Sequence, residues 1–396
     1  MSDDRRYYGL DALRGGMMLL GIVLHAATLY LAAPPPHVPI ATDPNKSLVM
    51  DAIFDFIHAF RMPCFFVLAG FFTALLVEKR GVAGAYRNRL ARIAAPFGAA
   101  MFTLLPVTLL FLLDFAISVR YGKHEILPDV RDLQRLEQES RARGIPQGIP
   151  VMHLWFLLYL LYFYLLIPFC RMLVRWSLPM ETRLGGWLAS AWALPAFALY
   201  TAATLWPYPG GQVFGDFIFL GLSPPAFLYY GSFFAIGYVY HHYRASTARL
   251  VHYVPWCAAV AVVLFPLSIY ASHLEYTYPG AEVSFHVLAI VLHSFCTWTL
   301  IWFFVGAALR WFDRPTPWVL YASQSSYWVY LLHLPVVCAV GWMLVPVDVP
   351  ALVKFAVVAG VTTVVCFVTY HYWVQDSWLG AFLHGKRFQL DWPWRP

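Results

Sequence analysis

The sequence has few charged residues. Only 12% of its 396 residues are Asp, Glu, Lys or Arg, whereas 60% are hydrophobic and the mean hydropathy is +0.61. Soluble domains carry about 25% charged residues, so this composition argues against a soluble globular protein. The chain contains repeated apolar runs of about 20 residues, a length that crosses a bilayer as a helix. The sequence therefore predicts an all-α integral membrane protein.

Metal motifs, internal repeats and disulfide patterns are also lacking. The six Cys residues lie inside apolar runs without metal-ligand spacing, which is typical of small packing residues. No HExxH motif occurs and the histidines are dispersed, so we expect neither a metal site nor a permanently bound cofactor. We find no repeated half, no separate soluble domain and no signal-peptide cleavage site. We therefore expect one transmembrane domain over residues 1–396, beginning with an uncleaved helix.

The apolar runs predict a single bundle of about ten transmembrane helices. The predicted spans are 9–33, 49–78, 92–118, 153–174, 185–205, 224–241, 252–273, 284–309, 325–346 and 350–374. Lys and Arg gather in alternate loops, which predicts that both termini are cytoplasmic. This pattern accounts for the net charge of +6 without a nucleic-acid partner. Segment 119–152 is predicted to be an extracytoplasmic loop of mixed charge containing a surface helix, either simply solvated or acting as a lid or acceptor contact.

Two ionisable residues stand out in the first helix. Arg14 and His25 are eleven residues apart, about three helical turns, so both side chains point to one face. Because an ionisable group inside a bilayer costs roughly 2.5–3.5 kcal/mol, it is retained mainly where it faces a protein interior and has a function. This face combines a cation near the inner surface with a titratable base in the outer half of the membrane.

The direction of each predicted span gives further polar residues a depth. In the second helix, Asp55 and His58 lie in the outer half as neighbours three residues apart, and Arg61 lies near the middle. The other candidates of the outer half and middle are His153, Trp155, Glu282, His286, His293, Tyr330 and His333. The candidates at the inner mouth are Arg14, Arg87, Arg89 and Arg92.

These positions separate two kinds of chemistry. Histidine is the usual proton acceptor near neutral pH, and an arginine cluster binds phosphates. An inner phosphate clamp and an outer general base fit a phosphorylated cytoplasmic donor that meets an acceptor on the far side. Each residue also has a structural interpretation. Asp55 and His58 can form a buried polar pair, and arginines collect in any inner loop.

Five sequence blocks in order carry a resemblance to a known family. They are LDALRG followed by His25, FRMPCFFVLAGFF, RNRLARIAAP, HLWFLLYLL and SSYWVYLLHLPV. Over nearly its whole length the chain resembles the membrane-bound acyltransferase-3 family. The segment RRYYGLDALRGGMMLLGIVLHA is similar to sequences of the family branch that succinylates osmoregulated periplasmic glucans. Ala69 replaces the serine that many relatives have in the FFVLSGF block, so we assign that position no role.

The resemblance implies an acyl-CoA-dependent transferase in the bacterial inner membrane. It implies cytoplasmic succinyl-CoA or acetyl-CoA as co-substrate and a periplasmic glucan as acceptor. Further expected partners are other copies of this chain, in a homo-oligomer, or glucan-synthesis proteins. His25 corresponds to the essential family histidine, and Arg14 to the arginine of the same helix. Further matches are Arg87, Arg89 and Arg92 in the arginine block, and Ser326, Tyr327, Tyr330 and His333 in the fifth block.

We therefore predict an O-succinyltransferase in which His25 deprotonates a glucose hydroxyl that attacks the thioester. Asp55 or Glu282 is expected to orient the histidine, and Arg61 or His58 to bind the succinyl carboxylate. In a variant of this mechanism His25 carries the acyl group covalently. Two other functions are compatible with the sequence: an O-acetyltransferase for another surface polysaccharide, and a proton-coupled transporter.

Overall fold

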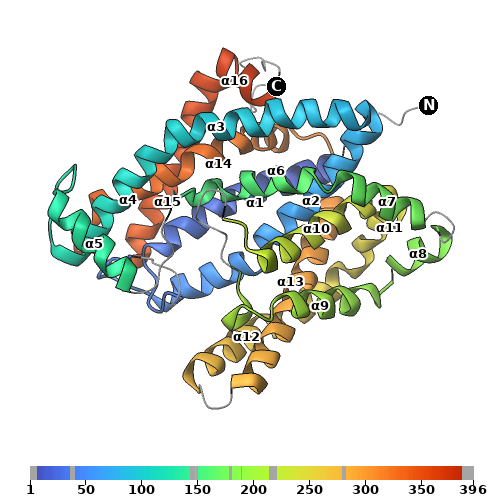
Figure 1. Ribbon diagram of the computed structural model, residues 1–396, viewed down its shortest axis with the longest axis horizontal. Helices are drawn as coiled ribbons and strands as arrows, with labels where there is room; N and C mark the ends of the chain where they lie inside the picture. The colour runs from blue at the N-terminus through green and yellow to red at the C-terminus, as the bar shows by residue number, and fades with distance from the viewer. Residues whose placement is uncertain are drawn as a thin grey trace.

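A computed structural model describes residues 7–35, 41–142, 148, 150–177, 181–188, 190–213, 221–278 and 282–385. Within these ranges the chain is built almost wholly from helices (Figure 1). In chain order they are α1 (Tyr8–Thr28), α2 (Leu48–Arg89), α3 (Ala95–Phe102), α4 (Leu104–Tyr121), α5 (Val130–Ala142), α6 (Trp155–Tyr164), α7 (Ile167–Ser177), α8 (Glu181–Leu188), α9 (Ala193–Thr204), α10 (Pro224–His242), α11 (Arg244–Arg249), α12 (Val254–Thr277), α13 (Glu282–Trp311), α14 (Pro317–Leu344), α15 (Ala351–Thr369) and α16 (Trp378–His384).

The described residues contain seven helical stretches that are long and apolar enough to cross a membrane. They are Tyr8–Thr28, Leu48–Phe102, Leu104–Tyr121, Thr247–Thr277, Val283–Trp311, Pro317–Leu344 and Ala351–Val374. An eighth is formed if the bent pair of α6 and α7, which meet at 54°, counts as one span. These stretches agree with the predicted helical membrane protein.

Three predicted spans differ in detail. The span 92–118 is interrupted, because a π-helical turn at Leu90–Ala94 and a break at Thr103 divide it between α3 and α4. The span 185–205 is divided between α8 and α9, and α9 has only 12 residues. The span 224–241 corresponds to α10, a helix of 19 residues whose tyrosines and histidines lower its hydropathy. The count of ten and the side of the termini stay predictions.

Helix α2 reverses its direction near its end. Gly81 has φ +67°, a left-handed conformation that glycine adopts at little cost, and it lies just beyond the predicted end of the second span. Because of this reversal, Arg89 returns to Thr73, with which it forms a 3.4 Å hydrogen bond. The arginine block that follows α2 is thereby folded against the helix.

Helix α1 occupies the middle of the molecule (Figure 1). It packs against α2, α13, α14 and α15, so its polar residues face protein.

Helices α2 and α10 cross with their backbones in close contact. A Cβ atom added to Gly70 would lie 1.9 Å from the Phe234 carbonyl oxygen, and one added to Gly237 would lie 2.0 Å from that of Val67. Small residues at helix crossings allow such close backbone contact in membrane proteins.

Candidate active site

The face of α1 that carries Arg14 and His25 lies against α14. Arg14 donates a 2.7 Å hydrogen bond to Ser323 Oγ and lies 3.2 Å from a carboxylate oxygen of Asp11. The ring of His25 lies 5.2 Å from that of His333, between centroids. Both residues therefore contact the same helix, which confirms the prediction from their spacing that they share one face.

His25, His333 and His153 form a group of three neighbouring rings, the histidine cluster. His333 and His153 are 5.3 Å apart between centroids. Nδ1 of His333 lies 2.7 Å and 3.0 Å from the carbonyl oxygens of Tyr330 and Val329, and Nε2 of His153 lies 3.3 Å from the Leu331 carbonyl oxygen. Carbonyl oxygens only accept hydrogen bonds, so these nitrogens carry the protons.

The other nitrogen of each buried ring is left with a lone pair. Nε2 of His333 and Nδ1 of His153 are buried and have no hydrogen-bond partner among the described residues. Backbone contacts thus fix both tautomers and direct two acceptors into the protein interior. His333 is 1% exposed and His153 is 5% exposed, whereas His25 is only half-buried. His25 is therefore the least buried residue of the three.

Arg61 places a permanent positive charge beside the cluster. Its side chain is 5% exposed, and Nε donates a 3.0 Å hydrogen bond to the Met17 carbonyl. The guanidinium fits against Gly21, where an added Cβ would lie 2.4 Å from Nη2. Its charge acts on all three rings of the cluster and on Tyr330. A guanidinium in this position can stabilise a negative charge that binds or develops near His25.

His153 and Trp155 are both buried at the start of α6. The chain enters this region through a turn in which Met152 has φ +47°, and Met152–Leu154 then forms a 3-10 helix that leads into α6. This turn places His153 in the cluster, beside Tyr330 and His333. Trp155 packs against Tyr230, with ring centroids 5.2 Å apart, and its surroundings are those of a core residue.

Tyr330 contacts the segment Met152–Leu154, which leads into α6. Its hydroxyl donates a 2.6 Å hydrogen bond to the carbonyl oxygen of His153. The residue is 4% exposed, and its ring lies 5.4 Å from that of His153. Tyr330 therefore helps to hold His153 in the cluster.

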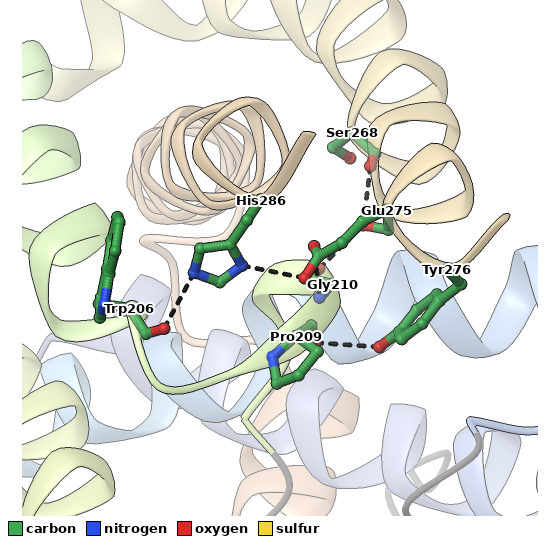
Figure 2. A network of polar contacts seen from close by, with 8 residues as sticks. Trp206, Pro209, Gly210, Ser268, Glu275, Tyr276 and His286 are labelled. Atoms are coloured by element: carbon green, nitrogen blue, oxygen red, sulfur yellow. Dashed lines mark hydrogen bonds and ion pairs between the residues drawn. The ribbon is translucent and has the colours of Figure 1, made fainter. Parts of the chain in front are cut away.

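A polar network ties α12 and α13 to the segment after α9 (Figure 2). Figure 2 shows the Glu275 carboxylate between His286 and Gly210, 2.9 Å from His286 Nδ1 and 2.8 Å from the Gly210 amide. The second ring nitrogen of His286 lies 2.9 Å from the Trp206 carbonyl oxygen. Both ring nitrogens of His286 thus have partners within the protein and hold the segment in place.

The segment held in this way positions Gln212. Its side-chain nitrogen donates a 3.2 Å hydrogen bond to Asp55 Oδ1. His58, one turn further along α2, stacks on Phe54 at 5.3 Å and interacts electrostatically with the buried His293. Asp55, His58, Gln212 and His293 therefore form a second polar group next to the cluster. No sequence pattern points to Gln212, which is a single amide in a connecting segment.

The four arginines predicted to form an inner clamp have separate surroundings. Arg92 donates hydrogen bonds of 2.8 Å and 2.9 Å to the carbonyl oxygens of Ala381 and Phe382 in α16. Arg89 contacts Thr73 and lies over the Tyr164 ring, 5.2 Å from its centroid. Arg87 is exposed, and Arg14 lies against α14 as described above. The side chain of Glu282 lies outside the described residues.

All six cysteines are buried and unpaired, as their positions in apolar runs predict. Within the described ranges, no group of three or more His, Cys, Asp or Glu side chains is arranged to hold a metal ion.

The apolar helices, with a histidine cluster buried among them, are those of a multi-pass membrane protein. Residues 7–371 match the family model described as an acyltransferase domain, so the chain belongs to the acyltransferase-3 family. Among curated proteins it is similar to "Glucans biosynthesis protein C" from Escherichia coli. It is 27% identical to the protein of strain O6:K15:H31 (536 / UPEC) and 26% identical to those of strains O1:K1 / APEC and K12 / DH10B. Each similarity covers 86% of this chain and 85% of the relative. No solved structure matches the chain.

Proposed function

We propose that this protein is an inner-membrane O-acyltransferase that moves a succinyl group from cytoplasmic succinyl-CoA to glucose hydroxyls of periplasmic glucans. Membership of the acyltransferase-3 family supports acyl transfer, and the similarity to proteins named for glucan biosynthesis supports the acceptor. The observation that carries the proposal is the half-buried His25 beside two buried histidines and Arg61. This arrangement supplies a base that a hydroxyl can reach and a cation for the charge that develops.

In the proposed reaction, His25 accepts the proton of a glucose hydroxyl as its oxygen attacks the thioester carbonyl. A C–O bond forms, the tetrahedral oxyanion collapses with cleavage of the C–S bond, and the CoA thiolate takes the proton from His25. The terminal nitrogens of Arg61 are available to an anion, because Nε is the atom that bonds to the Met17 carbonyl. Arg61 thus binds either the succinyl carboxylate or the oxyanion.

We propose a different positioning partner for His25 from the carboxylates that the sequence suggests. Asp55 already accepts a hydrogen bond from Gln212, whereas His333 lies directly beside His25 with an unprotonated Nε2. We therefore assign to His333 the positioning role first expected of Asp55 or Glu282. A covalent acyl-histidine is the variant in which His25 attacks the thioester itself.

The test is transfer by the purified protein with succinyl-CoA or acetyl-CoA and a neutral periplasmic-type glucan, read as product masses. We expect a succinyl adduct with the wild type and none with His25→Ala. His273→Ala is a matched control, because His273 is an exposed histidine of α12 remote from the cluster. Retained activity in His25→Ala contradicts the proposal. An acetyl adduct alone would make the protein an O-acetyltransferase.

A further inference from the structure

A basic cavity of about 840 Å³ lies between α2, α7, α8, α10 and α11. Four arginines line it, two from α7 and two from α11. A carboxylate of α2 and a histidine at the end of α10 also line it. These residues are Arg171, Arg175, Arg244, Arg249, Glu78 and His241. The cavity lies at the end of α2 that carries the arginine-rich loop, the predicted cytoplasmic side. Its volume is within the range of small-molecule sites, about 300–1,000 Å³.

The cavity has an excess of positive charge. Glu78 lies 3.3 Å from His241 Nε2 and 3.7 Å from Arg244 Nη1, so its negative charge is balanced by the positive charge of Arg244. In the described part of the chain, Arg171, Arg175 and Arg249 form no ion pair and remain exposed. Three guanidinium groups are thus left for an anionic ligand, and the planar guanidinium fork matches phosphate oxygens.

This cavity is separate from the α1–α14 site. At about 100° per residue, Ala74, Val77 and Glu78 share the face of α2 that lines the cavity, whereas Phe72 lies on the opposite face. Arg14 stacks on Phe72, with its guanidinium carbon 5.6 Å from the ring centroid. One turn before Ala74, α2 and α10 are in tight contact at Gly70. None of the residues that line the cavity belongs to the site around His25.

The helix that supplies two of the arginines has the composition of a membrane-interface helix. Arg171 and Arg175 are one turn apart on α7 and face the cavity. Elsewhere on α7, Phe169, Met172 and Trp176 are 47%, 39% and 71% exposed. Apolar and aromatic side chains of this kind are typical of the boundary between lipid and water. A helix of this composition suits the depth of the phospholipid headgroups, and the cavity that it lines would then open there.

We infer that this cavity is a binding site for a phosphate group, either that of an anionic phospholipid or that of a soluble nucleotide. Basic pockets between transmembrane helices on the cytoplasmic side are suited to such headgroups. The inference concerns binding at a site remote from His25, and it does not rest on the proposed acyl transfer.

The test measures binding by the full-length, delipidated protein in neutral detergent. Phosphatidylglycerol is titrated with detection by native mass spectrometry, with phosphatidylcholine as the neutral-headgroup control, and ADP is titrated by calorimetry. The pocket variant is Arg171→Gln with Arg175→Gln. The matched control is Arg310→Gln with Arg314→Gln, which removes the same charge from exposed positions in the last turn of α13 and just after it. Arg249→Gln tests the opposite wall of the cavity if the pocket variant fails to fold.

We expect the wild type to bind phosphatidylglycerol or ADP, and the pocket variant to bind the same probe about tenfold or more weakly. The control variant should bind as the wild type does. Binding of phosphatidylglycerol alone identifies a lipid site, and binding of ADP identifies a soluble ligand. Equal affinity in the pocket and control variants, or no binding of either probe by the wild type, would overturn the inference. Transfer activity plays no part in this readout, so the two proposals can fail independently.

Discussion

The ring of His25 in α1 lies 5.2 Å from the ring of His333 in α14, between centroids. His333 is held by two backbone carbonyls of its own helix, so its position and tautomer are fixed by α14 itself. His25 has the greater accessibility of the two. The pair thus combines a rigid buried ring with an accessible one, which leads to different expectations for substitutions at the two positions.

Replacing His333 with Asn should distinguish the contributions of its two ring nitrogens. The Asn amide nitrogen can still donate near the position of Nδ1, but nothing replaces the lone pair of Nε2. We expect the unfolding temperature to stay near that of the wild type and the transfer rate to fall by about 10²- to 10⁴-fold. The measurement is the rate of succinyl transfer together with thermal unfolding, with His273→Asn as control. An unchanged rate would exclude a positioning role for His333.

Replacing Arg61 with Met should affect the two donors unequally. If the guanidinium binds the succinyl carboxylate, its loss removes a charged hydrogen bond worth about 1.5–3 kcal/mol, or roughly tenfold to a hundredfold in kcat/KM. Acetyl-CoA has no carboxylate, so its transfer should fall less. The measurement is kcat/KM with both donors. An equal loss with both would remove the carboxylate-binding role and leave stabilisation of the oxyanion.

Replacing Arg92 with Ala should loosen α16. Its guanidinium donates to the carbonyls of Ala381 and Phe382, and the loss of charged hydrogen bonds destabilises by about 1.5–3 kcal/mol. We expect faster hydrogen exchange in α16. Arg87→Ala, at an exposed position nearby, should leave that exchange unchanged. A higher KM for acyl-CoA in Arg92→Ala, with normal exchange in α16, would instead support the phosphate clamp that the sequence suggests.

Replacing Gly70 with Ala should force α2 and α10 apart. The new Cβ would lie 1.9 Å from the Phe234 carbonyl oxygen, and a helix backbone cannot yield locally. We expect a loss of about 1–3 kcal/mol or more in the free energy of unfolding. In Gly98→Ala the new Cβ meets nothing within 4 Å, and Ala is the better helix former by about 1 kcal/mol. Thermal unfolding in detergent compares the two variants, and equal effects would contradict the close crossing.

Replacing Lys354 with Met should leave the buried carboxylate of Asp43 without its positively charged partner. Both oxygens of Asp43 lie 2.9 Å from Lys354 Nζ, and both side chains are fully buried. Removing one partner of a buried pair costs about 3–5 kcal/mol because the other charge stays unpaired. Adding Asp43→Asn to Lys354→Met should restore much of this loss. Thermal unfolding of the single and double variants forms the test, and additive losses would show that the two residues are not coupled.

The sequence was most informative where a property is local. Helical periodicity alone placed Arg14 and His25 on one face, and both do contact α14. Hydropathy found the apolar helices, but it could not show that Gly81 reverses α2 or that Thr103 separates α3 from α4. Those breaks depend on backbone conformation and not on the average polarity of a window.

The partners of the polar residues could not be read from the sequence. Arg92 looks like one member of an arginine block, but its ligands are carbonyl groups of a helix near the other end of the chain. His286 and His293 share a face of α13, and yet His286 braces a connecting segment while His293 approaches His58. Such assignments depend on which helices meet, and no spacing within a single helix contains that information.

The contacts between α1 and α14 also bear on how the protein is made. Helix α1 leaves the ribosome early, but Ser323 and His333, which its polar face contacts, belong to a helix that is synthesised in the last quarter of the chain. Until α14 enters the bilayer, the polar face of α1 lacks these partners, at the energetic cost that ionisable groups incur in lipid. Translation arrested before Pro317 would therefore leave a fragment with an exposed polar face in the membrane, a feature by which quality-control proteases can distinguish unfinished chains from complete ones.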